Sequence, residues 1–294
     1  MDLGKLVHAL QNHDELMFDL THLRQHGDET FSLNGEETLG KVIYDRMYER
    51  AKAKVMSNNA SNIQEFSNLG FCATLAAFSA AVLGVSDPHD MTPSEKSEVR
   101  GLHLLAATFN AMLPGVFAIS GWDLVGALLV QPESLGSLLD DRDYRWMNRG
   151  AFDLMAADPS ATASPGGLPR AQAIYGDLPA QLRDPDSFAS ILKRMLRARR
   201  DSGIALSRLV SVPEVDSEGL VVVLLERPTG WIISAVNFSR GPVGDVVHFP
   251  ELSGKTARRI FATDSEEAGS VQISDGGNLS LDLGPIQGEV FVVE

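Results

Sequence analysis

The chain has 294 residues, of which 44% are hydrophobic and 22% charged, so it has room for one large domain or two ordinary ones and is neither disordered nor fibrous. Its formal net charge of -14 at pH 7 argues against nucleic acid and anionic membranes as partners, because both bind clustered lysine and arginine side chains. The single cysteine, Cys72, excludes an intramolecular disulfide bond and a cysteine metal site.

The N-terminal residues show no basic region followed by an apolar core and a small-residue cleavage site, so we expect a cytoplasmic protein. The most apolar window, residues 69–85, is shorter than the ~20 residues that a membrane-spanning helix needs, and we expect no membrane partner. The histidines are scattered without metal-ligand spacing, so the sequence predicts neither a metal site nor a cofactor.

The first predicted element is an apolar strand over residues 6–10, which is followed by Asn12, His13 and Asp14. A buried parallel strand that ends in polar residues typically delivers them to a site at its carboxyl end. The alternative is structural: Asp14 caps the following helix, since aspartate is a favoured N-cap, and His13 packs beside it. Helical spacing of leucines then predicts a helix over residues 16–26.

Three further helices are predicted before the second strand. Residues 36–55 carry apolar side chains on one face and charged side chains on the other, which indicates a surface helix. Residues 66–84 are apolar on nearly every side, so this helix should be covered all round. Thr92, Pro93 and Glu95 predict the start of the third helix through an N-cap, a proline in the first turn and a carboxylate near the positive helix end.

A second apolar strand is predicted over residues 116–120, and Gly121, Trp122 and Asp123 follow it. It repeats the pattern of the first strand, because polar residues again follow a buried apolar run. Residues 131–184 are rich in proline, glycine and aspartate, which is typical of a long loop that forms a lid or a binding wall.

A basic helix is predicted after this loop. It opens at Asp184-Pro185-Asp186 and places apolar side chains between lysines and arginines as far as Ser202-Gly203. We interpret the basic run as a solvated or salt-bridged helix face, with polyanion binding as the less favoured alternative.

The periodicity changes near residue 207. Short segments rich in valine, isoleucine and leucine then alternate with turn residues, which predicts an antiparallel β-sandwich. We therefore divide the chain into residues 1–207 and a β-domain of residues 208–294. The predicted strands cover residues 209–215, 220–225, 231–238, 246–249, 259–262, 271–273, 279–283 and 289–293.

The order of these features resembles the end of a glycoside hydrolase family 13 (alpha-amylase family) enzyme. In that family the seventh barrel strand bears Asn-His-Asp, a helix ending in Leu-Pro-Gly leads to the eighth strand, a basic helix closes the barrel, and an antiparallel domain follows. The matching parts here are Asn12-His13-Asp14, Leu113-Pro114-Gly115 before residues 116–120, the helix around residues 191–200, and residues 209–294.

The resemblance implies an α/β plus all-β fold. Residues 1–207 would hold strands seven and eight of a (β/α)8 TIM barrel with their helices, and residues 208–294 the sandwich domain. Within the family, the string Leu-Gln-Asn-His-Asp-Glu-Leu at residues 10–16 is most similar to trehalose synthases, which interconvert maltose and trehalose.

The resemblance also implies roles for residues after the two strands. Asp14 corresponds to the acid that stabilises the transition state by gripping sugar hydroxyls, and His13 and Asn12 correspond to sugar contacts. Trp122 and Asp123 should reach the same barrel mouth, where the indole could stack on a sugar; packing and helix capping are the alternatives. Many family members have a Tyr-Gly-Asp-Glu loop at this point, and its absence points to an outlying subgroup.

The family takes its nucleophilic aspartate and its acid/base glutamate from strands four and five, and no residue of this chain matches those motifs. The resemblance thus implies the C-terminal portion of a retaining enzyme that acts on alpha-glucans or disaccharides. Its partners would be an alpha-glucoside and a missing N-terminal barrel portion, without which we expect no activity. The alternatives are a non-catalytic carbohydrate-binding or assembly module, a fragment of an amylase- or sucrase-type hydrolase, and an unrelated α+β domain.

Overall fold

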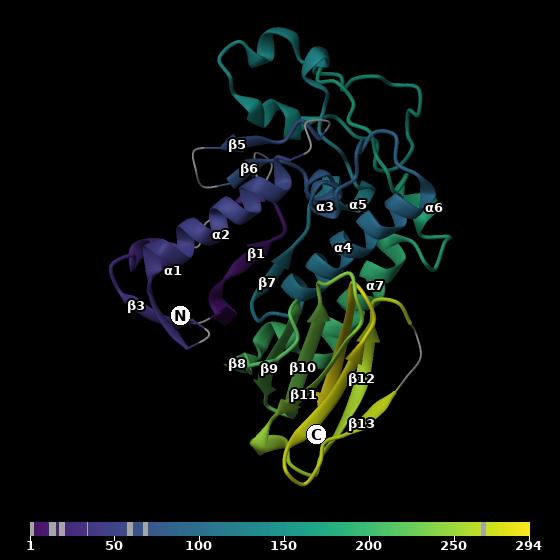
Figure 1. The fold of residues 1–294 in the computed structure, drawn as a ribbon. Helices are drawn as coiled ribbons and strands as arrows, with labels where there is room; N and C mark the ends of the chain where they lie inside the picture. Colours follow the sequence, from purple (N-terminus) through teal and green to yellow (C-terminus); the bar gives the residue numbers. More distant parts are fainter. Residues whose placement is uncertain are drawn as a thin grey trace. The chain divides into compact units, whose positions relative to one another are not determined.

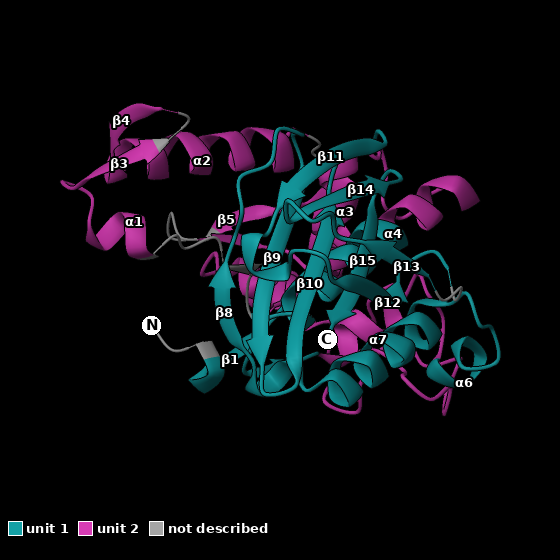
Figure 2. Cartoon of the chain, turned by 90° about the horizontal axis from the view of Figure 1, so that it is seen from below, with its two compact units in different colours: residues 1–10, 100–119, 178–294 teal, residues 11–99, 120–177 magenta. Residues whose placement is uncertain are grey.

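The computed structural model describes residues 3–11, 16–17, 21–33, 35–57, 61–66, 70–265 and 269–294, and Figure 1 shows its helices and strands. Its contacts define two compact units, which Figure 2 colours separately: unit 1 comprises residues 1–10, 100–119 and 178–294, and unit 2 comprises residues 11–99 and 120–177. Unit 1 thus contains the predicted β-domain together with segments from before residue 207, and the predicted domain boundary stays a prediction.

A six-stranded antiparallel sheet is the largest element of unit 1, in the strand order β13-β12-β15-β10-β9-β8. At its centre Ser234 lies opposite Val223 on one side and Val290 on the other. A second sheet pairs β11 with β14, and these strands confirm the predicted antiparallel region. The strands are β8 Arg208–Ser211, β9 Leu220–Arg227, β10 Gly230–Asn237, β11 Val243–His248, β12 Thr256–Ala262, β13 Ser270–Gln272, β14 Asn278–Leu283 and β15 Gln287–Val293.

Both faces of the large sheet are buried at its centre. On one face, Ile233 of the large sheet and Val247 of the two-stranded sheet belong to the same hydrophobic cluster. On the other face, α4 (Pro93–Ala111) lies close to β15, because a Cβ added at Gly288 would come within 2.9 Å of the Leu105 side chain. As a result, β10 and β15 are buried along most of their length, which fits their nearly continuous apolar sequences.

Two short parallel strands, β1 (Val7–Ala9) and β7 (Val116–Ala118), form a separate sheet in unit 1. Val7 lies opposite Val116, so the two predicted strands are neighbours and parallel. The prediction that they are buried is wrong, since Val7 is 71% and Val116 58% exposed. The physical reason is that, in the described part of the chain, no third strand extends this sheet.

The predicted basic helix is α7 (Phe188–Ser202), which follows the short α6 (Leu178–Gln181). Ser187 is its N-cap and accepts a hydrogen bond from the Ser190 N–H at 3.2 Å, and Gly203 ends it in the left-handed conformation. The predicted start of α4 is also confirmed, because the Glu95 carboxylate accepts from the Thr92 N–H at 2.8 Å in a reciprocal cap.

Unit 2 contains the helices α2 (Gly40–Val55) and α3 (Leu75–Leu83), and nearly all of α3 is buried. Tyr48 of α2, Phe71 and Met147 belong to the main hydrophobic cluster of this unit. Its other elements are α1 Thr21–Gln25, α5 Gly121–Val125, β2 Leu16–Met17, β3 Thr30–Leu33, β4 Glu36–Leu39, β5 Gln64–Phe66 and β6 Gly70–Cys72.

Three helices of unit 2 start later than predicted. The helix predicted over residues 16–26 is α1, which begins at Thr21, because Leu16–Met17 form the strand β2 against β6. The segment predicted to begin a helix at residue 36 is first the strand β4, which pairs antiparallel with β3. Gly35 lies between these strands with a φ of +79°, a conformation that favours glycine. The helix predicted from residue 66 begins only at Leu75, after the strands β5 and β6, and Thr74 caps it.

The long segment after α5 is mostly irregular, as predicted, and hydrogen bonds hold it in place. It also contains three short 3-10 helices, Pro132–Ser134, Gly136–Leu139 and Tyr144–Arg149. The Leu128 N–H donates to the Gln172 carbonyl at 2.8 Å, and the Val130 N–H donates to the Met147 carbonyl at 2.9 Å. The Arg170 guanidinium donates to three backbone carbonyls on the same segment, those of residues 158, 159 and 161. Its predicted role as a lid or binding wall stays a prediction.

Candidate functional site

His8 of β1 ties the parallel pair to the end of α4. Its Nε2 lies 2.8 Å from the carbonyl oxygen of Pro114, to which Nε2–H can donate, and its Nδ1 lies 2.7 Å from Oδ1 of Asn110. Both ring nitrogens of the half-buried imidazole therefore contact the connection between α4 and β7. These contacts fix the register of β1 against β7, and with it the place where the two strands end.

Gln11 links the segments that follow the two strands. It is buried, its Nε2 donates to Ser120 Oγ at 3.3 Å, and its Oε1 accepts from the Leu75 N–H at 2.6 Å. Ser120 comes two residues after β7, just as Gln11 comes two residues after β1. Residues just beyond the carboxyl ends of β1 and β7 thus meet, which is the arrangement that a shared site requires. Sequence analysis did not single out Gln11, although it directly precedes the Asn-His-Asp block.

The three residues of that block, Asn12, His13 and Asp14, lie outside the described residues. Their predicted roles, the transition-state contact of Asp14 and the sugar contacts of His13 and Asn12, therefore stay predictions.

Trp122 lies in α5, directly after the second strand. Its Nε1–H donates to the Gly150 carbonyl at 3.2 Å, and its ring centroid lies 5.4 Å from that of Phe152. The half-buried indole also packs against the main hydrophobic cluster of unit 2. These contacts match the packing alternative given above, while stacking on a sugar remains a prediction for the exposed part of the ring.

Asp123 forms a reciprocal cap with Ser120 at the start of α5. Its Oδ2 accepts from the Ser120 N–H at 3.0 Å and from Ser120 Oγ at 2.8 Å, and the Asp123 N–H donates back to Oγ at 3.2 Å. The residue is only 1% exposed. The described contacts of this carboxylate are those of the capping alternative, so a sugar contact by Asp123 would require α5 to open and stays a prediction.

Arg199 is the exception to the interpretation of the basic run as a solvated or salt-bridged helix face, which holds for the exposed Lys193 and Arg197 and for Arg200, paired with Asp201. It is 7% exposed, and its guanidinium donates to the carbonyl oxygens of Ala111, Leu113 and Gly115. These carbonyls form the end of α4 and the turn that leads into β7, where acceptors have no helical partner. Burial lowers the pKa of Arg199 below its usual value. Arg199 therefore binds the carboxyl end of α4, where the helix dipole also favours a cation.

A second polar cluster joins α2 to β5 in unit 2. Tyr48 Oη donates to Glu65 Oε1 at 2.8 Å, and Lys52 Nζ lies 2.7 Å from Glu65 Oε2. The hydrogen bond from Lys52 is the main cause of the lowered pKa of Glu65, whereas burial and the bond to Glu65 raise the pKa of Tyr48. The cluster crosslinks two elements of this unit.

Two searches of the described residues gave negative findings. No group of three or more histidine, cysteine, aspartate or glutamate side chains could hold a metal ion within the described ranges. No described helix is both long enough and apolar enough to cross a membrane.

Comparison with known proteins gives structural similarities alone. No family model and no curated protein matches the sequence. Among solved structures, the chain is similar to Amy13B of Eubacterium rectale, with 14% identity and a TM-score of 0.49 over 76% of this chain and 37% of that one. It is also similar to the isomaltulose synthase of Klebsiella sp. LX3, with 14% identity and a TM-score of 0.47 over 66% of this chain and 38% of that one.

A third similar structure is the alpha-amylase of Geobacillus thermoleovorans complexed with acarbose, with 14% identity and a TM-score of 0.46 over 74% of this chain and 36% of that one. The chain thus spans little more than a third of the length of these structures. Similarities this distant do not establish the family, which stays a prediction from the sequence motifs.

Proposed function

We propose that this chain is the C-terminal portion of a glycoside hydrolase family 13 enzyme that acts on an alpha-glucoside, with trehalose synthases as the most similar members. The parallel pairing of β1 with β7 carries the proposal, because these strands follow the motif order of barrel strands seven and eight. The contact between Gln11 and Ser120 supports a common site beyond their carboxyl ends.

Within this proposal the polar block after β1 grips the sugar. The Asp14 carboxylate would accept hydrogen bonds from sugar hydroxyls that strengthen as the ring distorts toward an oxocarbenium-like transition state. His13 would donate to a hydroxyl of the same sugar and Asn12 would hold a neighbouring group, while the indole of Trp122 would offer an apolar face. Bond cleavage would depend on a nucleophile and an acid/base group for which this chain has no matching motif.

The exposed parallel pair supports a further part of the proposal, the need for a complementary barrel portion. A two-stranded parallel sheet has two open edges, and the facing valines Val7 and Val116 are largely exposed here. Closure of a barrel would pair both edges and cover these side chains. We propose that the N-terminal barrel strands, which would also bear the two reactive carboxylates, pair with β1 and β7.

The proposal is tested by assaying the purified chain on maltose, trehalose, sucrose and maltooligosaccharides. We expect no turnover by this chain alone, and calorimetric binding of a disaccharide that weakens in Asp14→Asn. The matched control is Asp28→Asn, a change of the same kind at an exposed carboxylate outside the strand ends.

The two parts of the proposal fail in different ways. Robust turnover that disappears in Asp14→Asn would support the site and overturn the need for a second barrel portion. Sugar binding that is equal in Asp14→Asn and Asp28→Asn would overturn the site. A non-catalytic carbohydrate-binding module is the second candidate, because no motif for the two reactive carboxylates is present; it predicts binding of the sugar but no gain of activity when a complementary barrel portion is added.

A further inference from the structure

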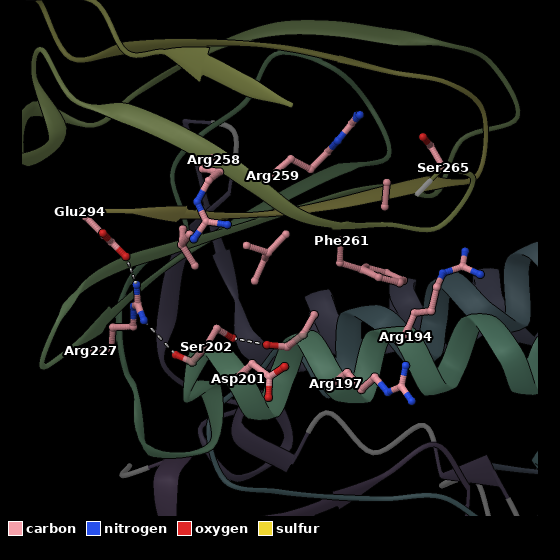
Figure 3. A pocket seen from close by; sticks show the side chains of 14 residues that line it. Arg194, Arg197, Asp201, Ser202, Arg227, Arg258, Arg259, Phe261, Ser265 and Glu294 are labelled. Atoms are coloured by element: carbon pink, nitrogen blue, oxygen red, sulfur yellow. Dashed lines mark hydrogen bonds and ion pairs between the residues drawn. The ribbon is translucent and has the colours of Figure 1, made fainter. Parts of the chain in front are cut away.

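A groove in unit 1 lies between α7 and the large antiparallel sheet. Its volume is about 580 Å³, within the range of small-molecule sites, and it is distinct from the strand ends proposed to hold the sugar. Figure 3 shows that α7 forms one wall, with Arg194 on the side toward the sheet and the Arg197 side chain directed away from it, while β12 forms the opposite wall, with Arg258 and Phe261.

The groove concentrates positive charge in a chain that is strongly acidic overall. Its lining holds five arginines, and the only carboxylates among the described lining residues are Asp201 and Glu294. Both carboxylates already bind arginine: Asp201 accepts from Arg200 at 2.8 Å, and Glu294 accepts from Arg227 at 3.4 Å. The lining therefore has an excess of cationic side chains, which favours an anionic ligand.

One of these arginines is available for a ligand. The side chain of Arg258 is exposed and forms no hydrogen bond or ion pair in the described structure, and Figure 3 shows it directed from β12 toward the groove. In addition, Nε of Arg227 is buried and has no hydrogen-bond acceptor among the described residues. A buried donor without an acceptor is unfavourable, so an oxygen-rich ligand or water would stabilise this wall.

The groove also has an apolar surface beside its charges. Ile260 and Phe261 of β12 and Val292 of β15 line it, and Figure 3 shows the Phe261 ring directed toward α7. A bare inorganic ion would not use this surface. A ligand that joins an anionic head to a ring of monosaccharide or nucleoside size would contact both parts.

We propose that this groove binds a small phosphate ester, with the phosphoryl group held by Arg258 and the carbon skeleton against Ile260 and Phe261. The guanidinium group presents paired N–H donors whose geometry matches phosphate oxygens, and it stays charged at every physiological pH. The site is separate from the sugar site proposed after β1.

Isothermal titration calorimetry of the full chain with glucose 6-phosphate, AMP, inorganic phosphate and glucose tests the proposal. We expect at least one of the two esters to bind more tightly than inorganic phosphate, and glucose not to bind in the groove. The stronger ester identifies the source of the phosphoryl group, a sugar or a nucleotide. If neither ester binds with a Kd below about 10 mM, the proposal is wrong.

Single substitutions place the site. Arg258→Ala should weaken ester binding about tenfold or more, and Arg258→Lys should weaken it less, because lysine keeps the charge but loses the paired donors. The matched control is Arg183→Ala, which removes an exposed arginine of unit 1 outside the groove. Equal weakening by the control, or unchanged binding in Arg258→Ala with unchanged circular dichroism, would contradict the assignment.

Discussion

The two β-structures of unit 1 differ in how much surface their strands bury, although both are built from short apolar runs. In the six-stranded sheet the central strands β10 and β15 are covered on both faces, and Phe291 is 1% exposed. In the two-stranded parallel pair, Val7 is 71% exposed. An apolar run thus predicts a strand in both places, but the number of strands around it decides whether the run becomes core.

This difference implies that the two sheets contribute very unequally to stability. Burial of apolar surface stabilises by about 25 cal/mol per Å², so a strand covered on both faces contributes much more than one open to water. A two-stranded sheet is only marginally stable by itself. The pair β1–β7 is held mainly by its hydrogen bonds and by the contacts of His8 with Asn110 and Pro114.

The largest effect is expected for Phe291→Ala in the six-stranded sheet. The substitution removes a fully buried ring and leaves a cavity, which should lower the free energy of unfolding by about 3–5 kcal/mol. Urea denaturation followed by circular dichroism measures the loss. Phe117→Ala in β7 is the matched control and should cost clearly less, because Phe117 is only partly buried. Equal losses of unfolding free energy in the two variants would contradict the inference that the two sheets contribute unequally to stability.

Arg199→Met should have the next largest effect, about 2–3 kcal/mol, because carbonyls at the end of α4 lose a charged donor. The neighbouring Arg200→Met removes an exposed arginine paired with Asp201 and should change stability by no more than about 0.5 kcal/mol. The two unfolding curves, recorded side by side, check the prediction. A similar cost for both variants would mean that the buried guanidinium adds little to the connection into β7.

Glu289→Gln should change the pH dependence of stability. Burial raises the pKa of Glu289 in the folded protein, and its ion pair with Arg259 only partly opposes this. Between the usual carboxyl pKa and the raised one, the folded state binds more protons than the unfolded state, so stability falls as pH rises, by at most about 1.4 kcal/mol per pH unit. Glutamine should remove this fall, measured as unfolding free energies from pH 4 upward. A steeper fall in the variant would contradict the direction.

The smallest effect is expected for Val7→Thr, within about 0.5 kcal/mol, because the side chain is already exposed to water. Val290→Thr in β15 puts the same hydroxyl into a fully buried position and should cost about 1–3 kcal/mol. Thermal unfolding of the two variants compares one substitution in the two sheets. A cost for Val7→Thr that matches Val290→Thr would show that β1 is covered in solution.

Much of the strand pattern after residue 207 could be predicted, because short apolar segments there are separated by clear turn residues. The start of α4 could be predicted too, since Thr92 and Glu95 form a local cap that depends on no distant residue. Structure that depends only on contacts within a few residues could therefore be predicted from the sequence.

Features fixed by distant contacts were missed. The strand β4 has an amphipathic pattern that continues into α2, so the prediction treated both as one helix over residues 36–55. The hairpin signal Asn34-Gly35, which precedes β4, was missed. The helical spacing does place Arg199 on the apolar face of α7, four residues after Met195, but the sequence does not show which acceptors it meets there. For the candidate site, the order of polar residues after the two strands could be read, but the contact of Gln11 with Ser120 required the fold.

The position of Arg199 also sets an order in which the chain can complete its fold during synthesis. The carbonyls that it binds precede it by 84 to 88 residues, so they leave the ribosome long before their donor exists. At about 5–20 residues per second, this delay lasts several seconds. Until α7 emerges, the turn into β7 must rely on water for its hydrogen bonds, and a nascent chain halted before residue 199 would hold the parallel pair in an unfinished state.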